Sequence, residues 1–334
     1  MSRLFRFLTP AVSPTLLGAL SIAACTLLGS GQAQAQAYPT KPIKAIVPFA
    51  PGSATDQIGR AFAAKMSEQL GQPIVVDNKP GVNGMLGVDA VAKSPADGYT
   101  LLFGTNSTNA ALKSLMNKLP YDQETAFTPV GFMGAVPLIV GINPSLPYKT
   151  LREFVDAAKA KPDSISFASA STSQLVSSEM LAFTAGISMT HVPYKSGPAA
   201  MTDLIGGQVN MFTADFAVML PQVKAGKVRG LAVTSSKRSR AIPELPTVNE
   251  ALGVKDYELI AYFAAFAPAG TPPEAIAKLN KALNDAANSK EIQEKFSALG
   301  FEIDPGPPEA LAQRNRRETA KWAKAIKDAK IEPQ

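Results

Sequence analysis

The chain has 334 residues, of which 46% are hydrophobic and 18% are charged, and its formal net charge is +6. This composition is that of a folded globular protein and excludes a disordered or collagen-like chain, while the length predicts two domains. Because the basic residues are spread along the chain and form no dense stripe with aromatic platforms, we expect no nucleic-acid partner.

Residues 1–37 have the pattern of a secretory signal peptide. Two arginines precede the apolar tract 11–28, and small residues at A-x-A spacing follow it, which predicts cleavage near Ala35 or Ala37. The alternative is a short membrane anchor, but the tract is broken and lacks the roughly 20 sustained apolar residues that a span needs. We therefore expect an exported protein.

The one cysteine of the chain, Cys25, lies inside this apolar tract. Lipidation at Cys25 remains an alternative, because the residues before it faintly resemble a lipoprotein cleavage box. If the segment is removed, the mature chain has no thiol, so it forms no disulfide and no cysteine-ligated metal site.

From residue 43 onward, short apolar runs alternate with helical patterns. We predict strands at 43–47, 74–76, 99–103, 136–142, 165–168, 189–192, 209–212, 228–233 and 259–266. Helices are predicted in most intervals: one ends at Gly71, one lies near 86–93, one opens at Thr150 with a capping box, and one is capped by Thr271 and runs to about Asn288. This alternation predicts an α/β fold with parallel sheets covered by helices.

Two apolar runs flanked by proline, 136–143 and 259–268, are candidate crossings between domains. If both cross, one lobe is discontinuous and consists of 38–139 and 262–334, and the other lobe is 140–261. This arrangement predicts a clamshell with a ligand cleft between the lobes.

The loop 48–56 is the most informative segment of the chain. It joins the first predicted strand to a helical pattern, and it consists of small and turn-forming residues such as Gly52 with the helix-capping residues Ser53, Thr55 and Asp56. Backbone N–H groups at a helix start are unpaired and carry partial positive charge. The loop therefore predicts a cradle for an anion.

Three more loops follow predicted strands in a similar way. The loop 78–84 is rich in glycine and proline, and the loops 104–108 and 169–174 carry hydroxyl and amide side chains. In α/β sheets, ligands bind at the edge where parallel strands end. Together the loops predict one small acidic ligand that is held mainly by backbone groups.

The residues offer little for catalysis, a metal or a cofactor. His191 is the single histidine, and a hydrogen-bonded structural role is the better interpretation of it than a role as a catalytic base. A mature chain with one histidine and no cysteine lacks the ligands of an ordinary zinc site. Neither a calcium loop nor a nucleotide-binding motif is present in the sequence. For Asp56 we favour a role in orienting the loop over one as a general acid. We expect no cofactor and no enzymatic activity.

Motifs along the whole of the chain that follows the signal segment resemble one family, the Bug-type extracytoplasmic solute receptors, which are the substrate-binding subunits of tripartite tricarboxylate transporters. The segments that carry the resemblance are 38–43, 48–56, 78–87, 97–100, 119–122, 191–195, 206–209, 223–226, 231–235, 243–248 and 267–272, together with Arg60.

The resemblance implies a periplasmic, two-lobed binding protein of the type II kind with parallel-rich sheets. It implies that the protein is a monomer, binds a small organic acid and delivers it to integral-membrane permease subunits. The ligand-binding residues carried over from the family are Phe49, Ala50, Pro51, Gly52, Ser53, Ala54, Thr55, Asp56, Val82, Asn83 and Gly84 in the first lobe, and Thr105, Asn106, Ser171, Thr172, Ser173, Gln174, Tyr194, Lys195 and Asp215 for the variable end of the ligand.

Two other functions stay open from the sequence. One is a secreted carboxylate-processing enzyme in which Asp56 or Lys195 is catalytic, and the other is a ligand-sensing receptor for a signalling kinase. The loop that ends at Gln174 is shorter than is usual in the family, and Ser53 stands where the family usually has glycine. The identity of the acid, whether a di- or tricarboxylate or an aromatic acid, therefore stays open.

Overall fold

The computed structural model describes residues 1–2 and 38–333. The chain divides into two compact units, Met1–Thr40 and Lys41–Gln334, and the fold given below is that of the second unit. The signal-peptide prediction and Cys25 fall on residues outside the described part. Among the residues described, no helix is both long and apolar enough to cross a membrane.

All nine predicted strands are present, eight of them with ends shifted by at most three residues, whereas β4 begins well before its predicted start at residue 136. They are β1 (Ile43–Val47), β2 (Ile74–Asn78), β3 (Thr100–Thr105), β4 (Phe127–Ile142), β5 (Ser166–Ser169), β6 (Thr190–Pro193), β7 (Met211–Asp215), β8 (Arg229–Val233) and β9 (Ile260–Pro268). The helices are α2 (Ala54–Leu70), α3 (Met85–Ala92), α4 (Leu112–Leu115), α5 (Leu151–Ala160), α6 (Thr172–Ala185), α7 (Gly197–Gly206), α8 (Phe216–Lys224), α9 (Val248–Leu252), α10 (Pro273–Asn288), α11 (Lys290–Ser297) and α12 (Pro308–Asp328), with a 3-10 turn η1 (Val82–Gly84) and a π-helical turn η2 (Ser107–Ala111).

The strands form one mixed sheet in the order β2-β1-β3-β9-β4-β7-β5-β6, and β8 also pairs with β4. β1 is parallel to β2 and β3, and β5 is parallel to β6 and β7. β4 and β9, in contrast, are antiparallel to every strand they pair with. The predicted α/β fold is confirmed, with parallel strands at both ends of the sheet, and β4 and β9 add antiparallel pairs in its middle.

β4 is a 16-residue strand that links two groups of strands. Its first part, as far as Pro137, pairs with β9, and its second part, from Leu138, pairs with β7 and β8. The sequence predicted only the second part, because two register shifts and Gly134, at φ 148°, interrupt the apolar alternation before it. The change of partners makes the fold two-lobed. We keep 38–139 with 262–334 and 140–261 as proposed lobe boundaries.

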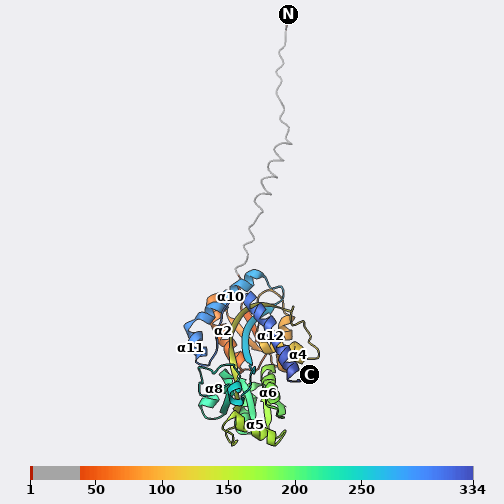
Figure 1. Cartoon of the computed structure of the whole chain (residues 1–334). Helices are drawn as coiled ribbons and strands as arrows, with labels where there is room; N and C mark the ends of the chain where they lie inside the picture. The colour runs from red at the N-terminus through yellow and green to blue at the C-terminus, as the bar shows by residue number, and fades with distance from the viewer. Residues whose placement is uncertain (3–37, 334) are drawn as a thin grey trace. The chain divides into compact units, whose positions relative to one another are not determined.

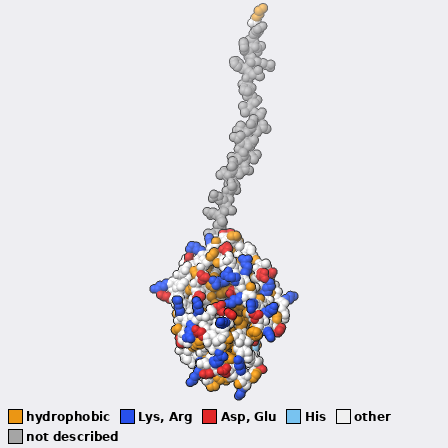
Figure 2. Space-filling model, viewed as in Figure 1, with side chains coloured by type: hydrophobic (Ala, Val, Ile, Leu, Met, Phe, Trp, Pro, Cys, Tyr) orange, Lys and Arg blue, Asp and Glu red, His pale blue; other side chains and the backbone are white. Residues whose placement is uncertain are grey.

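The helices of this unit cover the two groups of strands separately. In Figure 1, α2, α10, α11 and α12 lie at one end of the unit, and α5, α6 and α8 lie at the other. A buried apolar cluster that includes Ile46, Leu102, Phe132 and Phe266 fills the space between the first group of strands and its helices. On the face shown in Figure 2, basic and acidic side chains are intermixed, so no part of it has a single sign of charge.

The predicted helix ends were correct in part. Gly71 ends α2 at φ 66°, and Thr150 caps α5 through a bond from the Glu153 N–H. The Glu153 carboxylate, however, accepts from the Lys149 N–H, so the capping box is not reciprocal. Thr271 is not the cap of α10 as predicted, because its hydroxyl donates to the Pro268 carbonyl inside the preceding turn.

Candidate functional site

A cleft opens where the carboxyl ends of β1, β3, β5 and β7 meet the starts of α2, α6, α7 and α8. It contains about 510 Å³ of space, including its open mouth. Its walls are formed by Phe49, Ala50, Ser53, Ala54, Thr55, Thr105, Ser107, Ala170, Ser171, Ser173, Gln174, Lys195, Ser196, Gly197, Asp215, Val218, Ala261 and Phe263. The carboxyl edge of a sheet is where α/β proteins bind ligands.

The start of α2 provides the donors on one wall. Ser53 is the N-cap, and its hydroxyl accepts from the Asp56 N–H at 3.3 Å. Ala54 and Thr55 come next, and within the part of the chain that the structure describes no protein acceptor is found for the N–H group of either residue. Both residues are buried and line the cleft. The wall therefore presents unpaired N–H groups at the positive end of a helix, which is the arrangement that binds a carboxylate or another anion.

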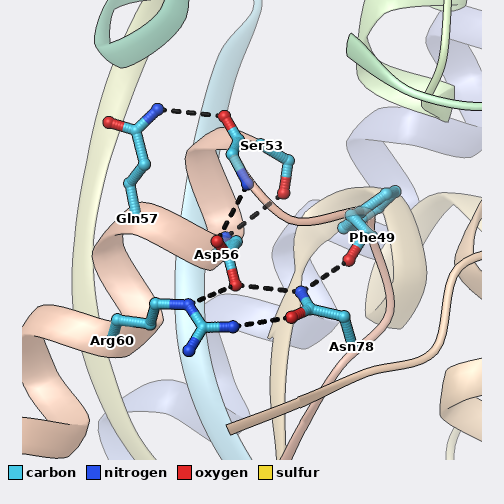
Figure 3. A network of polar contacts seen from close by, with 7 residues as sticks. Phe49, Ser53, Asp56, Gln57, Arg60 and Asn78 are labelled. Carbon is cyan, nitrogen blue, oxygen red and sulfur yellow. Dashed lines mark hydrogen bonds and ion pairs between the residues drawn. The ribbon is translucent and has the colours of Figure 1, made fainter. Parts of the chain in front are cut away.

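A buried network holds this loop in place (Figure 3). Asp56 is 4% exposed, and its carboxylate accepts hydrogen bonds from the Gly52 N–H at 2.9 Å, from Arg60 Nε at 2.8 Å and from Asn78 Nδ2 at 2.9 Å. Asn78 Nδ2 also donates to the Phe49 carbonyl at 2.9 Å. Asp56 does not line the cleft. Its contacts are those of a residue that orients the loop, as we favoured from the sequence, and leave no oxygen free of a partner for acid–base chemistry.

The opposite wall is formed by the segment that leads from β5 into α6. The Ala170 N–H donates to Gln174 Oε1 at 2.8 Å, which fixes the orientation of the Gln174 amide. The Ser173 N–H donates to Ser107 Oγ at 2.9 Å. Ser107 follows β3, so this bond joins the two groups of strands directly across the cleft. Gly52 and Pro198 also approach each other, since a Cβ atom on Gly52 would lie 3.4 Å from Pro198 Cγ.

Asp215 and Lys195 are the charged residues among those that line the cleft. Asp215 is 7% exposed, and burial raises the pKa of its carboxyl group to about 6 against the opposing effect of hydrogen bonds from its own backbone and from Gln174. Lys195 is exposed at the rim.

Of the 20 residues predicted to bind ligand, 11 line the cleft. They are Phe49, Ala50, Ser53, Ala54, Thr55, Thr105, Ser171, Ser173, Gln174, Lys195 and Asp215. The other nine are Pro51, Gly52, Asp56, Val82, Asn83, Gly84, Asn106, Thr172 and Tyr194, and they lie outside its walls. Their contact with a ligand stays a prediction.

Several of these nine residues pack against or hydrogen-bond other parts of the protein instead. The turn η1, expected as a second cradle, packs behind the first loop: a Cβ atom on Gly84 would lie 3.3 Å from Phe49 and from Pro48. Asn106 donates to the Ile260 carbonyl at 2.7 Å and so ties the end of β3 to β9. The Tyr194 hydroxyl donates to Asp203 at 2.7 Å.

Seven wall residues were not predicted from the sequence, namely Ser107, Ala170, Ser196, Gly197, Val218, Ala261 and Phe263. Ser107 lies in a loop whose hydroxyl groups were noted, and Ser196 has the pattern of a helix cap before glycine and proline, so both had a local signal. Ala261 and Phe263 lie on β9, and they reach the cleft through long-range pairing: Phe263 is opposite Thr105 on β3, and Ala261 is opposite Val136 on β4.

The single histidine lies away from the cleft. His191 Nε2 and Ser169 Oγ are 2.8 Å apart, and the imidazole ring of His191 stacks on Phe167. Burial lowers the pKa of His191. These contacts agree with the structural role that we favoured. In the described part of the chain, no group of three or more His, Cys, Asp or Glu side chains is placed to hold a metal ion.

The model of the family described as "Tripartite tricarboxylate transporter family receptor" matches residues 58–331. Protein BugT of Bordetella pertussis is 36% identical over 316 residues, which are 94% of this chain and 97% of BugT.

Three similar solved structures each cover most of this chain. The R. palustris protein Rpa4515 with adipate has a TM-score of 0.86 at 33% identity and covers 89% of this chain and 100% of its own. The periplasmic binding protein BugD has a TM-score of 0.85 at 33% identity with the same coverage. MatC from Rhodopseudomonas palustris with bound malate has a TM-score of 0.83 at 30% identity and covers 86% of this chain and 100% of its own.

Proposed function

Since this chain belongs to the tripartite tricarboxylate transporter receptor family, we propose that it captures a small organic carboxylate in the cleft and delivers it to a tripartite tricarboxylate-type membrane permease. The unpaired N–H groups of Ala54 and Thr55 at the start of α2 carry this proposal. Adipate and malate in two related structures support the ligand class. The permease partner, the periplasmic location after export and the monomeric state are parts of the same proposal.

The ligand's carboxylate docks first on the wall formed by α2. A helix N-terminus contributes about 0.3–1 kcal/mol to anion binding and up to about 2 kcal/mol when partly buried. Micromolar affinity requires about 8 kcal/mol. Most of the free energy of binding therefore comes from hydrogen bonds and water exclusion when the lobes close over the ligand.

Closure depends on contacts that exist only when the walls are together. The bond from the Ser173 N–H to Ser107 Oγ is such a contact, because the two residues belong to different proposed lobes. We expect the ligand to shift an equilibrium between open and closed forms toward the closed one. Small-angle scattering with and without a proven ligand tests this, and identical dimensions in both states would rule out the closing mechanism.

Replacing Ser107 by alanine is expected to weaken ligand binding by about 3- to 10-fold. The substitution removes the acceptor of the Ser173 N–H, and a hydrogen bond of this kind contributes about 0.5–1.5 kcal/mol to the closed state. Isothermal titration with a bound acid measures the change. Ser188→Ala, at an exposed position away from the cleft, is the control and should bind as the wild type does. Equal affinity of both variants would show that this bond does not hold the closed state.

The direct test of the proposed function is thermal unfolding of the mature protein against mono-, di- and tricarboxylates, both aliphatic and aromatic. A ligand at 100 times its dissociation constant adds about 2.7 kcal/mol to the free energy of unfolding. We expect stabilisation by one class of acid. If no carboxylate raises the melting temperature, the proposed ligand class is wrong.

The two rival functions receive no support from the geometry. An enzyme would need Asp56 or Lys195 as a catalytic group, yet Asp56 faces the interior network and Lys195 is exposed at the rim. Recovery of the bound acid unchanged after long incubation, checked by mass spectrometry, would count against catalysis. The family membership favours a transport receptor over a signalling receptor.

A further inference from the structure

The charges of the cleft are arranged asymmetrically. Among the residues that line it, Asp215 is the one acid and Lys195 is the one base. Asp215 is buried at 7% exposure at the carboxyl end of β7, whereas Lys195 is exposed at the rim. An acid in a cleft that is otherwise suited to anions needs a physical explanation.

Asp215 neither caps a helix nor belongs to an ion pair of the described residues. It precedes α8 as the N-cap residue, but its side chain makes no capping hydrogen bond. No lysine, arginine or histidine among the described residues forms an ion pair with it, although 13 ion pairs are found elsewhere. A buried carboxylate without a cation is unfavourable, and the raised pKa of Asp215 is a consequence of this burial.

The environment keeps Asp215 available as a hydrogen-bond acceptor. Gln174 Oε1 is occupied by the Ala170 N–H, so the NH₂ end of the amide is the end that can serve Asp215. An ionised carboxylate has about four acceptor positions, and the hydrogen bonds from Gln174 and from the backbone of Asp215 itself leave part of this acceptor capacity unused. Val218 on α8 and Phe263 on β9 line the same cleft and have apolar side chains without a hydrogen-bond donor.

We propose that Asp215 is a specificity-determining residue that accepts a hydrogen bond from a donor on the ligand, an ammonium or a hydroxyl group. The site would then prefer an amino acid or a hydroxy acid to a plain dicarboxylate of the same length. The carboxylate of the ligand lies on the N–H groups of Ala54 and Thr55, and its donor faces Asp215. A second carboxylate in that place would be repelled by Asp215. This inference rests on the proposed function.

Titration calorimetry with matched acids at pH 7.5 tests the proposal. The four-carbon set is succinate, L-malate and L-aspartate, and equivalent sets with five and six carbons cover differences in cleft length. We expect the wild type to bind a hydroxy or amino acid at least about 10-fold more tightly than the plain diacid of that length, since hydrogen bonds to charged groups are the stronger ones. Comparison of the hydroxy acid with the amino acid then shows which donor is used.

Asp215→Asn separates charge from shape, because asparagine has the same size and offers an NH₂ group. We expect this variant to lose the preference and to bind the plain diacid at least as well as the donor-bearing acid. Asp156→Asn, which removes an exposed acid on α5 in the same proposed lobe, should keep the wild-type ranking. Melting curves without ligand check that each variant is folded.

The outcomes separate this inference from the proposed function. If the wild type binds plain diacids as tightly as donor-bearing acids, or if Asp215→Asn keeps the preference, the role of Asp215 is wrong and the receptor function stands. If the wild type binds none of the acids, the proposed function itself fails and the inference fails with it.

Discussion

Asp56→Ala is expected to lower the free energy of unfolding by about 2–4 kcal/mol and to weaken carboxylate binding at least about 10-fold. The substitution leaves the Gly52 N–H, the Asn78 amide and the Arg60 guanidinium without the acceptor that they share. Removing one partner from a buried, hydrogen-bonded charge is strongly destabilising. Urea unfolding and calorimetric titration measure the two effects. The loss of affinity would arise indirectly, because the network orients the loop whose N–H groups line the cleft.

Asp77→Ala is the matched control for this prediction. Asp77 lies next to Asn78 but is half-exposed, and its carboxylate is 3.7 Å from Lys79 Nζ. An exposed pair of this kind contributes about 0–1 kcal/mol, so the control should change stability and binding little. If Asp56→Ala is as stable as the control, the network does not hold the loop.

Asp215→Asn is expected to stabilise the ligand-free protein at neutral pH by up to about 3 kcal/mol. The pKa of Asp215 is about 6 in the folded chain, against an ordinary value of 3.8, and each pKa unit corresponds to about 1.4 kcal/mol. The folded state thus holds the proton more tightly than the unfolded state. The favourable contribution is fully present below pH 3.8 and is lost as the pH rises through about 6.

The measurement is the free energy of unfolding of wild type and Asp215→Asn between pH 4 and pH 8. The difference between the two proteins should be small near pH 4 and should grow until the pH passes about 6. Other titrating groups are shared by both proteins and cancel in the difference. A difference that does not change with pH would show that ionisation of Asp215 does not destabilise the fold. If Asp215→Asn is more stable and has lost the ligand preference, Asp215 lowers the stability of the fold in return for its role in binding, which is a common trade-off at functional sites.

Local patterns in the sequence predicted much of this protein. Each strand except the first part of β4 is marked by an apolar run of a few residues. The C-cap at Gly71 and the N-cap at Thr150 are marked by single residues next to a periodic segment. The loop after β1 was recognisable for the same reason, because helix capping and unpaired N–H groups are properties of one helix start. The motifs that resemble the receptor family were also readable directly, and the family model confirms that membership.

The tertiary structure determined the features that depend on residues far apart in the chain, namely strand pairing, the lining of the cleft and burial. The first half of β4 pairs with β9 across more than a hundred residues, and its glycines and bulges weaken the local strand pattern. The place of Phe263 in the cleft follows from the pairing of β9 with β3 and β4, and the bond from Ser173 to Ser107 likewise joins residues that are 66 positions apart. The burial of Asp215 without a cation likewise depends on the arrangement of all the elements around it. Strand pairing and burial are set by the packing of the whole domain, so the sequence determined the kind of site, whereas the tertiary structure determined which side chains face the ligand.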